Sequence, residues 1–345
     1  MLLDALERAP RLRFAQLPTP LHRLPRLSEH LGGPQLWIKR DDLTGLPGGG
    51  NKTRKLEFVV ADAVRQGADT LVTVGAVQSN HTRQTAAAAV RAGIRCVLLH
   101  NGWAPAPGPY YRTVGNALLS DLLGAEMYAD DTPRHIDDPG RIDELVDHLR
   151  GEGRTPYLIP GGASDHPLGG HGYAACAAEI ETQAATLGVR FDAIVHCTGS
   201  SSTQSGLLAG LAALGSTTRV IGVADDDERD EKCVRILRLA NATLATLGLP
   251  QRVTPDRVEV VIADANPYGV ASEETLAAIR LLARTEGLIA DPVYEGRAVR
   301  GVVDLVRAGR FAPGQHVLVM HLGGSPAVHA WGGRLAGAGL RPLPF

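Results

Sequence analysis

Lysine is scarce in this chain, and two of its lysines lie close together. Of the 35 basic residues, four are Lys and 31 are Arg. A position that needs only positive charge can use Arg, whereas Lys can lose its proton and act as an amine nucleophile. Lys52 and Lys55 share the hexapeptide Asn51–Leu56, while Lys39 and Lys232 stand apart. The pair is therefore the first candidate for amine chemistry.

A glycine run precedes this pair, but its spacing disfavours a nucleotide-phosphate loop. That motif needs Lys directly after its last Gly, and here Asn51 separates Gly50 from Lys52. No strand rich in Val or Ile leads directly into the glycines either. An NTP-binding site is therefore the weakest interpretation, and a turn that caps a helix at Asn51 remains open.

Two further segments could bind anions where a strand gives way to a helix. Ser79 and Asn80 follow an expected strand at 70–74, and a helix start with such donors suits a substrate carboxylate. The segment 198–203 (TGSSST) follows an expected strand at 193–197 and offers hydroxyl and N–H donors to a phosphate. The alternatives are an ordinary polar helix cap for the first segment and a Ser-rich turn for the second.

Tyrosine supplies candidate acid–base groups. Aromatic residues make up 4% of the chain, yet Tyr268 and Tyr294 both lie in Pro-containing turns. A packed core does not need Tyr there, although ordinary surface Tyr explains each one alone equally well. The histidines are dispersed, without HxxxH or HExxH pairs, so no metal site is expected. Taken together, an amine, a phosphate cradle, an anion-binding helix start and two tyrosines fit pyridoxal phosphate as a cofactor.

Length and composition are typical of a globular protein with about two domains. The chain has 345 residues, of which 44% are hydrophobic, and a formal net charge of −2. Balanced charge disfavours a nucleic-acid binder, and no apolar run approaches the ~20 residues of a membrane span. The N-terminus lacks the apolar segment of a signal peptide, and the four cysteines form no CxxC. We expect a cytoplasmic protein that binds neither nucleic acid nor membrane.

Short β-rich runs alternate with amphipathic stretches along the chain. This alternation predicts an α/β fold with mostly parallel sheets, and sites in the loops at the carboxyl ends of the strands. We expect strands at 36–39, 70–74, 96–100, 157–160, 193–197, 219–223, 258–262 and 316–321. We expect helices at 53–66, 82–92, 112–123, 141–149, 174–187, 203–214, 273–286 and 296–308.

Six sequence blocks identify a family. They are GGNKTRKLEF (49–58), QSNHTRQ (78–84), SDHPLGGHGY (164–173), STQSG (202–206), RTEGLIADPVYEG (284–296) and HLGG (321–324). Over about 18–330 the chain resembles the family of 1-aminocyclopropane-1-carboxylate deaminase and D-cysteine desulfhydrase, among the fold-type-II pyridoxal-phosphate enzymes. The resemblance implies two domains, each a mostly parallel twisted sheet flanked by helices. The large cofactor domain would comprise 1–53 and 163–345, the small inserted domain 54–162, in a homo-oligomer that acts on a small amino acid.

The resemblance also implies roles for individual residues. Lys52 would be the Schiff-base lysine, Tyr294 and Tyr268 the paired tyrosines near the reacting carbons, and Glu295 the carboxylate that faces the pyridine nitrogen. Further cofactor contacts are implied for Lys55, Asn80, Ser200, Ser201, Ser202, Thr203 and Leu322. Substrate contacts are implied for Ser79, which is also counted as catalytic, and for Asn80, His81, Trp103 and Tyr294.

Two residues favour the deaminase branch of this family. Glu295 and Leu322 match the deaminase, whereas desulfhydrases tend to carry Ser or Thr at both places. A carboxylate beside the ring nitrogen stabilises a pyridinium, which is a stronger electron sink. We therefore expect a deaminase that converts 1-aminocyclopropane-1-carboxylate into 2-oxobutyrate and ammonia.

Other residues depart from the deaminase pattern and keep alternatives open. His81 stands where the deaminase has Gln, Ala163 where it usually has Cys, and Ser201 where the family has Gly. A positive φ, which Gly allows, would strain a Ser at position 201. A β-eliminating lyase acting on D-cysteine is the nearest alternative, and a non-catalytic relative of the family is a weaker one.

Overall fold

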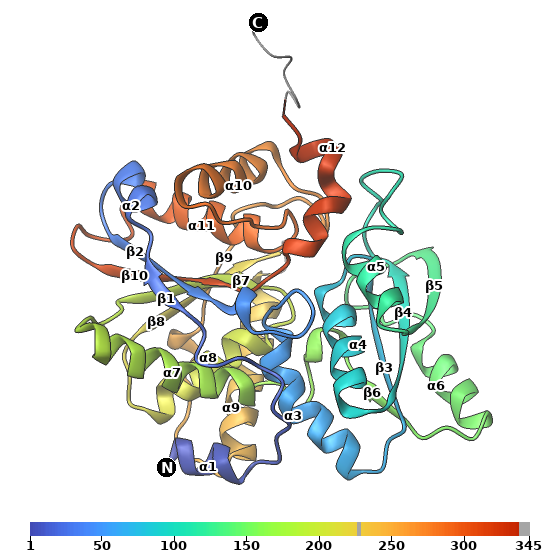
Figure 1. Cartoon of the computed structure of the whole chain (residues 1–345). Coiled ribbons are helices and arrows are strands. Elements are labelled where there is room, and N and C mark those ends of the chain that lie inside the picture. The colour runs from blue at the N-terminus through green and yellow to red at the C-terminus, as the bar shows by residue number, and fades with distance from the viewer. Residues whose placement is uncertain (226–228, 338–345) are drawn as a thin grey trace, which may run out of the picture.

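The computed structural model describes residues 1–225 and 229–337, whose strands form two sheets (Figure 1). The larger sheet runs β1 (Leu21–Arg23), β2 (Gln35–Arg40), β10 (His316–His321), β7 (Ala193–Thr198), β8 (Arg219–Ala224) and β9 (Glu259–Val261). The smaller sheet runs β5 (Glu126–Pro133), β4 (Arg95–Gly102), β3 (Thr70–Ala76) and β6 (Pro156–Ile159). All pairings among these strands are parallel except β1 with β2.

Alternating apolar side chains bury both faces of the larger sheet. On β10, Val317 and Val319 point to one apolar core, and Leu318 and Met320 to another. The first core is closed by α2 (Pro25–Leu31), α10 (Glu273–Glu286) and α11 (Glu295–Arg307). The second is closed by α7 (His171–Leu187), α8 (Ser202–Ala213) and α9 (Arg229–Thr246), and α1 (Leu2–Arg8) packs against α7.

The smaller sheet is covered in the same way. On β3, Leu71 packs towards α3 (Lys52–Arg65) and α4 (Asn80–Ala92), whereas Val72 and Val74 pack towards α6 (Ile142–Gly151). The helix α5 (Gly115–Leu122) lies beside α4, and the short α12 (Gly332–Leu335) ends the described chain. Because nearly all strands are parallel, their carboxyl ends gather where the two sheets face each other, and loops there are free to form a site.

The α/β fold of parallel sheets with flanking helices is confirmed, as are all the expected strands and helices, with shifted ends. The helix expected at 112–123 begins only at Gly115, which has a positive φ of 61°. Six α-helices and strands of the described residues went unpredicted: α1, β1, α2, β5, α9 and α12. The strand β5 is an exposed edge without apolar alternation, so its sequence gives no strand signal.

Two classes of feature are absent from the described residues. Within 1–225 and 229–337, no helix combines the length and the apolar content that crossing a membrane requires. Over the same ranges, no cluster of three or more His, Cys, Asp or Glu has the arrangement of a metal site.

Candidate active site

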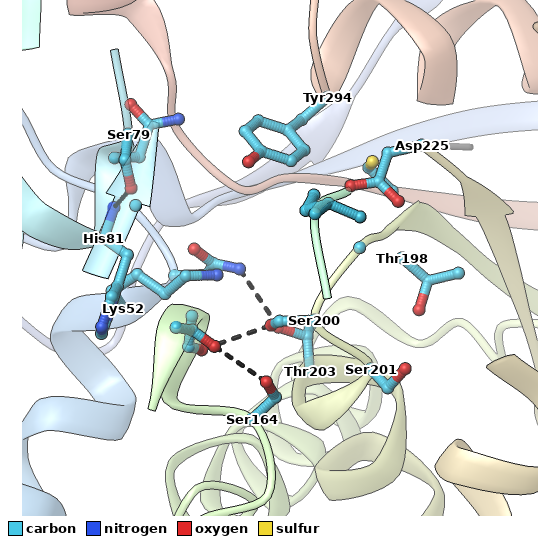
Figure 2. A pocket seen from close by; sticks show the side chains of 18 of the residues that line it. Lys52, Ser79, His81, Ser164, Thr198, Ser200, Ser201, Thr203, Asp225 and Tyr294 are labelled. Atoms are coloured by element: carbon cyan, nitrogen blue, oxygen red, sulfur yellow. Dashed lines mark hydrogen bonds between the residues drawn. The ribbon is translucent and has the colours of Figure 1, made fainter. Parts of the chain in front are cut away.

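The carboxyl ends of strands from both sheets open into one cavity. Figure 2 shows Lys52, Ser79 and His81 on one side of it, Thr198, Ser200 and Ser201 on the other, and Tyr294 opposite Ser200. The remaining predicted residues in its wall are Asn80, Trp103, Thr203, Tyr268, Glu295 and Leu322. The structure thus brings together residues that lie as far apart in sequence as Lys52 and Leu322.

Lys52 begins α3, and a tight glycine turn fixes where that helix starts. Gly49 has a φ of 62°, and a Cβ there would lie 1.7 Å from the carbonyl oxygen of Asp42. The helix start is then held by Gln84, whose Oε1 accepts from the backbone N–H of Thr53 at 2.8 Å. Only Gly fits so close an approach, so this run serves to position the amine and not to bind a nucleotide.

The environment of Lys52 makes its amine easier to deprotonate. Burial disfavours the charged form and lowers the pKa of Lys52 to about 8, although a hydrogen bond with Lys55 and the charge of Asp225 act in the opposite direction. A neutral amine is the nucleophilic form of lysine. The cavity therefore presents Lys52 as a usable nucleophile near neutral pH.

Two predicted residues, Lys55 and Ser202, lie behind the cavity wall. Lys55 is fully buried one helical turn after Lys52, and its Nζ donates to Ser202 Oγ at 2.8 Å. Burial and the nearby charge of Lys52 both lower the pKa of Lys55. This bond ties the start of α3 to the start of α8, across the gap between the two sheets.

The segment before α4 presents donors to the cavity. Ser79 is the N-cap of α4, and its Oγ accepts from the backbone N–H of His81 at 3.1 Å, which leaves its own O–H free to donate. Asn80 Oδ1 accepts from Asn116 Nδ2 at 2.8 Å, so the amide nitrogen of Asn80 is its remaining donor. Ser79 is thus a helix cap, as one interpretation of the sequence expected, and it also lines the cavity.

His81 is held as a neutral ring with one fixed tautomer. The Thr73 hydroxyl donates to the carbonyl oxygen of Ile159 at 2.7 Å, so Thr73 Oγ1 must accept from His81 Nε2 at 2.8 Å. Burial, together with the charges of Lys52 and Lys55, keeps the pKa of His81 well below its usual range. His81 therefore presents an unprotonated Nδ1, which is buried and has no hydrogen-bond partner.

The loop between β7 and α8 has the geometry of an anion cradle. Ser201 is the N-cap of α8 with a φ of 65°, so this Ser adopts the positive φ that Gly would allow. Its side chain makes no cap hydrogen bond, and its Oγ is buried without a partner. Thr203 Oγ1 is held by Asn51 Nδ2 at 3.1 Å, and Ser200 Oγ donates to the carbonyl oxygen of Gly162 at 3.2 Å (Figure 2). The backbone N–H of Ser202 donates to the carbonyl oxygen of Ser200 at 2.8 Å, so the N–H groups that follow it in the first turn of α8 are the ones that an anion can use.

Tyr268 and Tyr294 form a direct pair. Their hydroxyl oxygens lie 2.5 Å apart, and their ring centroids 5.9 Å apart. Burial raises the pKa of both phenols above the ordinary value. The nearby Tyr268 raises the pKa of Tyr294 further. Both stay protonated near neutral pH, so one O–H is shared within the pair and the other can be directed at a ligand.

Asp291, which the sequence analysis did not single out, places Tyr294 and Glu295. Its Oδ1 accepts from the backbone N–H of Tyr294 at 2.9 Å, and its Oδ2 from that of Glu295 at 3.3 Å. Burial, and next the negative charge of Asp291, raise the pKa of Glu295 well above its usual range. Glu295 Oε1 is buried and has no hydrogen-bond partner. A buried acid with one unpartnered oxygen suits a ligand nitrogen that shares its proton.

The charged residues Asp225, Lys232, Asp137 and Arg235 also line the cavity and were not predicted as site residues. Lys232 Nζ lies 3.1 Å from Asp225 Oδ1, and Arg235 Nη2 lies 3.0 Å from Asp137 Oδ2. Their position could have been anticipated in part. Asp225 lies two residues after the expected strand at 219–223, where α/β folds place their sites, but α9, which carries both cations, went unpredicted.

The donor set of the cavity fits pyridoxal phosphate. Three kinds of group lie around one cavity. The nucleophilic amine suits the cofactor's aldehyde, the anion cradle suits its phosphate, and the buried acid with one unpartnered oxygen suits its pyridine nitrogen. The three groups come from different elements, α3, the β7–α8 loop and the start of α11. A Ser-rich turn alone would leave Ser201 Oγ and Glu295 Oε1 unexplained.

Known proteins similar to this chain agree with that fit. The family model described as "Pyridoxal-phosphate dependent enzyme" matches residues 12–323. A protein of Burkholderia cenocepacia named 1-aminocyclopropane-1-carboxylate deaminase is 45% identical over 331 residues, 95% of this chain and 98% of that protein. A protein of the same name from Methylobacterium nodulans is 45% identical over 334 residues, 96% of this chain and 98% of its own length.

A solved structure matches the fold as a whole. The structure, described as a crystal structure analysis of the ACC deaminase homologue, superposes with a TM-score of 0.87 at 36% sequence identity. The match covers 97% of this chain and 98% of the other. With the match of the family model over most of its length, this chain belongs to the family of pyridoxal-phosphate dependent enzymes.

Proposed function

We propose that this enzyme is a deaminase that opens the ring of 1-aminocyclopropane-1-carboxylate. One water is consumed, and 2-oxobutyrate and ammonia are released. The observation that carries this proposal is the pair of Tyr268 and Tyr294 hydroxyls, 2.5 Å apart in the same cavity as the Lys52 amine. The names of the relatives from Burkholderia cenocepacia and Methylobacterium nodulans support the same substrate.

In this proposal the cofactor is held at four places. Lys52 would bind its aldehyde, Asn80 and Leu322 would line its ring, and Glu295 would face its pyridine nitrogen. The loop of Ser200, Ser201, Ser202 and Thr203 would receive the phosphate, with Lys55 behind it. When bound, the cofactor supplies an electron sink for the carbon that carries the substrate amine.

Glu295 is suited to strengthening that sink. Because its pKa is raised by burial, the residue carries a proton that it can share with a ring nitrogen. The neighbouring neutral His321 cannot supply this proton in place of Glu295. Its Nδ1 accepts a hydrogen bond from the backbone N–H of Gly323 at 3.3 Å and lies 3.8 Å from Glu295 Oε2. A cyclopropane without an α-hydrogen has no easy first proton to lose, so its opening depends most on the strength of the sink.

The substrate carboxylate is proposed to bind at the start of α4. The Ser79 hydroxyl and the Asn80 amide nitrogen are the side-chain donors there, and the positive end of the helix dipole adds to their attraction for an anion. His81 and Trp103 bound the same part of the cavity. This orientation directs the rest of the small substrate towards the two tyrosines.

Lys52 and Tyr294 are then the groups that move protons. When it is not bonded to the cofactor, the Lys52 amine would act as a general base, because burial lowers its pKa to about 8. Tyr294 would assist opening of the ring either by donating its proton or, after passing that proton to a base, by attacking a ring carbon. Tyr268 supports Tyr294 through their shared hydrogen bond.

His81 favours a second candidate, a β-eliminating lyase that acts on D-cysteine. Its neutral ring offers an unpartnered Nδ1 as a hydrogen-bond acceptor. The Gln expected of a deaminase at this position would offer an amide instead. Elimination of a thiol begins with removal of an α-proton and makes less demand on Glu295. Both candidates use the same amine and carboxylate sites.

Two structural proposals accompany this function. The division into a large domain, 1–53 with 163–345, and a small domain, 54–162, is supported by the membership of the strands in the two sheets. The homo-oligomeric state remains a prediction from the family, and light scattering on the purified protein checks it.

The experiment that tests the function is a keto-acid assay with two substrates. The cofactor-loaded protein is supplied with 1-aminocyclopropane-1-carboxylate and, separately, with D-cysteine. Release of 2-oxobutyrate from the first supports the proposal. Pyruvate from D-cysteine, without turnover of the cyclopropane, establishes the lyase instead.

A further inference from the structure

Lys232 has no role in the function proposed above, although it is one of only four lysines in the chain. It lies in the first turn of α9, its residue is 4% exposed, and it lines the cavity. A long cationic side chain is seldom buried to this extent without a specific partner. Its contacts therefore indicate what it does.

The ammonium of Lys232 lies against the loop that cradles the anion. Its Nζ is 3.4 Å from the carbonyl oxygen of Gly199, in the segment that leads into Ser201 and α8. It is also 3.1 Å from Asp225 Oδ1, which orients the side chain. Asp225 is close to the loop too, since a Cβ on Gly199 would lie 2.4 Å from Asp225 Oδ2.

A carboxylate this close to an anion cradle would repel a phosphate. Lys232 offsets the charge of Asp225, and its ammonium can make a charge-assisted hydrogen bond to a phosphate oxygen. Lys55, the other lysine near the loop, has a pKa held well below its usual value by burial and by Lys52. Ser201 Oγ, buried and unpartnered in the same wall, is a second donor that a phosphate would satisfy.

We propose that Lys232 is a further cofactor-binding residue, whose ammonium binds the phosphate of pyridoxal phosphate, with Asp225 as its positioning residue. This rests on the proposed phosphate site at 200–203. It does not depend on which amino acid the enzyme consumes.

The test compares binding of pyridoxal phosphate with binding of pyridoxal, which lacks the phosphate. Cofactor-free protein is titrated with each compound, and the dissociation constants are read from absorbance and fluorescence. Lys232→Gln should lower the preference for pyridoxal phosphate over pyridoxal by about tenfold or more, because a charge-assisted hydrogen bond is lost. Lys232→Arg, which retains a cation, should keep most of the preference. If Lys232 had a purely structural role, Lys232→Gln would weaken the binding of both compounds equally.

Two further variants distinguish failure of the proposal for Lys232 from failure of the proposed phosphate site. Thr203→Val removes a hydroxyl of the phosphate cradle and should also lower the preference. Arg235→Gln removes the cation one turn further along α9, which pairs with Asp137, and should leave the preference unchanged. If Thr203→Val lowers the preference and Lys232→Gln does not, the proposal for Lys232 is overturned. If neither variant changes the preference, both the proposed phosphate site and the proposal for Lys232 are overturned.

A measurement on the unaltered protein covers the case in which Lys232→Gln does not fold. Lysine acetylation by acetic anhydride is followed by mass spectrometry in protein saturated with pyridoxal phosphate or with pyridoxal. Lys232 should be acetylated at least several-fold more slowly with the phosphorylated compound. Equal acetylation in the two samples contradicts a contact between Lys232 and the phosphate.

Discussion

The hydroxyl oxygens of Tyr268 and Tyr294 lie 2.5 Å apart, so neither phenol acts independently of the other. Burial raises the pKa of both, which keeps one proton between the oxygens and one available to a ligand. Tyr294 is also fixed through its backbone, since Asp291 Oδ1 accepts from its N–H. The pair thus provides a fixed proton donor whose orientation depends on both rings.

Removing the Tyr294 hydroxyl should therefore abolish most of the turnover of 1-aminocyclopropane-1-carboxylate. We expect Tyr294→Phe to lower kcat by about 100-fold or more, the usual range for loss of a positioned acid–base group. Tyr268→Phe should have a smaller effect on kcat, since it removes only the partner. Steady-state release of 2-oxobutyrate measures both, and an unchanged kcat in Tyr294→Phe would remove this tyrosine from the reaction.

Lys52→Ala should lose the visible absorbance of the lysine-bound cofactor and all turnover. The side chain supplies the amine that binds the cofactor aldehyde, and Lys55 points instead to Ser202. Absorbance spectra of the purified variant, with circular dichroism as a control for folding, check this. Retention of the absorbance in a folded variant contradicts the assignment of Lys52.

Capture of the cofactor should accelerate steeply between pH 6 and pH 8. With a pKa of about 8, roughly 10% of the Lys52 amine is neutral at pH 7, against well under 0.1% for an unperturbed lysine. Because the pKa is lowered, the reactive neutral form gains population as pH rises and levels off above about 8. Stopped-flow absorbance measures the rate of capture, and a rate that still rises about tenfold between pH 8 and pH 9, as an unperturbed lysine would give, would rule out the lowered pKa.

Glu295→Gln should separate the two candidate reactions. The amide can donate a hydrogen bond but cannot transfer a proton to the ring nitrogen, so the electron sink weakens. We expect deamination of the cyclopropane to fall by about 100-fold, on the scale of one lost acid–base group, and any elimination from D-cysteine to fall less. Keto-acid assays on both substrates give the ratio. Equal losses on the two substrates would show that Glu295 does not favour the deaminase reaction.

A buried charge network holds the helix that carries Lys52. Arg54 is buried in α3, and its Nε lies 2.8 Å from Asp41 Oδ2 and its Nη1 3.0 Å from Glu179 Oε2. Burial alone would raise the pKa of Asp41, but Arg54 and the neighbouring Lys39 and Tyr173 lower it overall. Asp41 therefore contributes stability above its unfolded pKa, and that contribution is lost as the pH falls through its lower folded pKa.

Arg54→Met should destabilise the protein by about 3–5 kcal/mol, because it leaves buried carboxylates unpaired. Arg141→Met is the matched control, since Arg141 pairs with Glu144 on an exposed surface and its loss should leave the free energy of unfolding nearly unchanged. Urea unfolding measures both. Similar costs for the two variants would contradict a structural role for the buried network.

Much of the fold could be predicted because its elements carry their own signals. The strands at 193–197 and 316–321 are buried on both faces and read as apolar runs, and the helix at 273–286 has a Ser cap and a Gly stop. The helix α9 was missed although Ile236, Leu239 and Ala240 recur at helical spacing. The edge strand β5 could not be predicted, since exposure removes its alternation.

The candidate site was predictable where residue types are chemically unusual in their context. A lysine after a glycine run and a Ser-rich loop after a strand stand out in a sequence, and both line the cavity as expected. The contacts of Asp225, Lys232 and Asp291 depend on how distant elements meet, which no local pattern encodes. The 2.5 Å contact between Tyr268 and Tyr294, from residues 26 apart, is of the same kind.

The most direct test of the proposed function is the keto acid released when cofactor-loaded protein meets 1-aminocyclopropane-1-carboxylate. Lys52→Ala is the control for background release. We predict 2-oxobutyrate and ammonia in equal amounts, formed over many turnovers and absent with the control. The deaminase is contradicted if protein that carries its cofactor releases no 2-oxobutyrate but forms pyruvate from D-cysteine. In that case His81, and not Glu295 with Leu322, indicates the substrate.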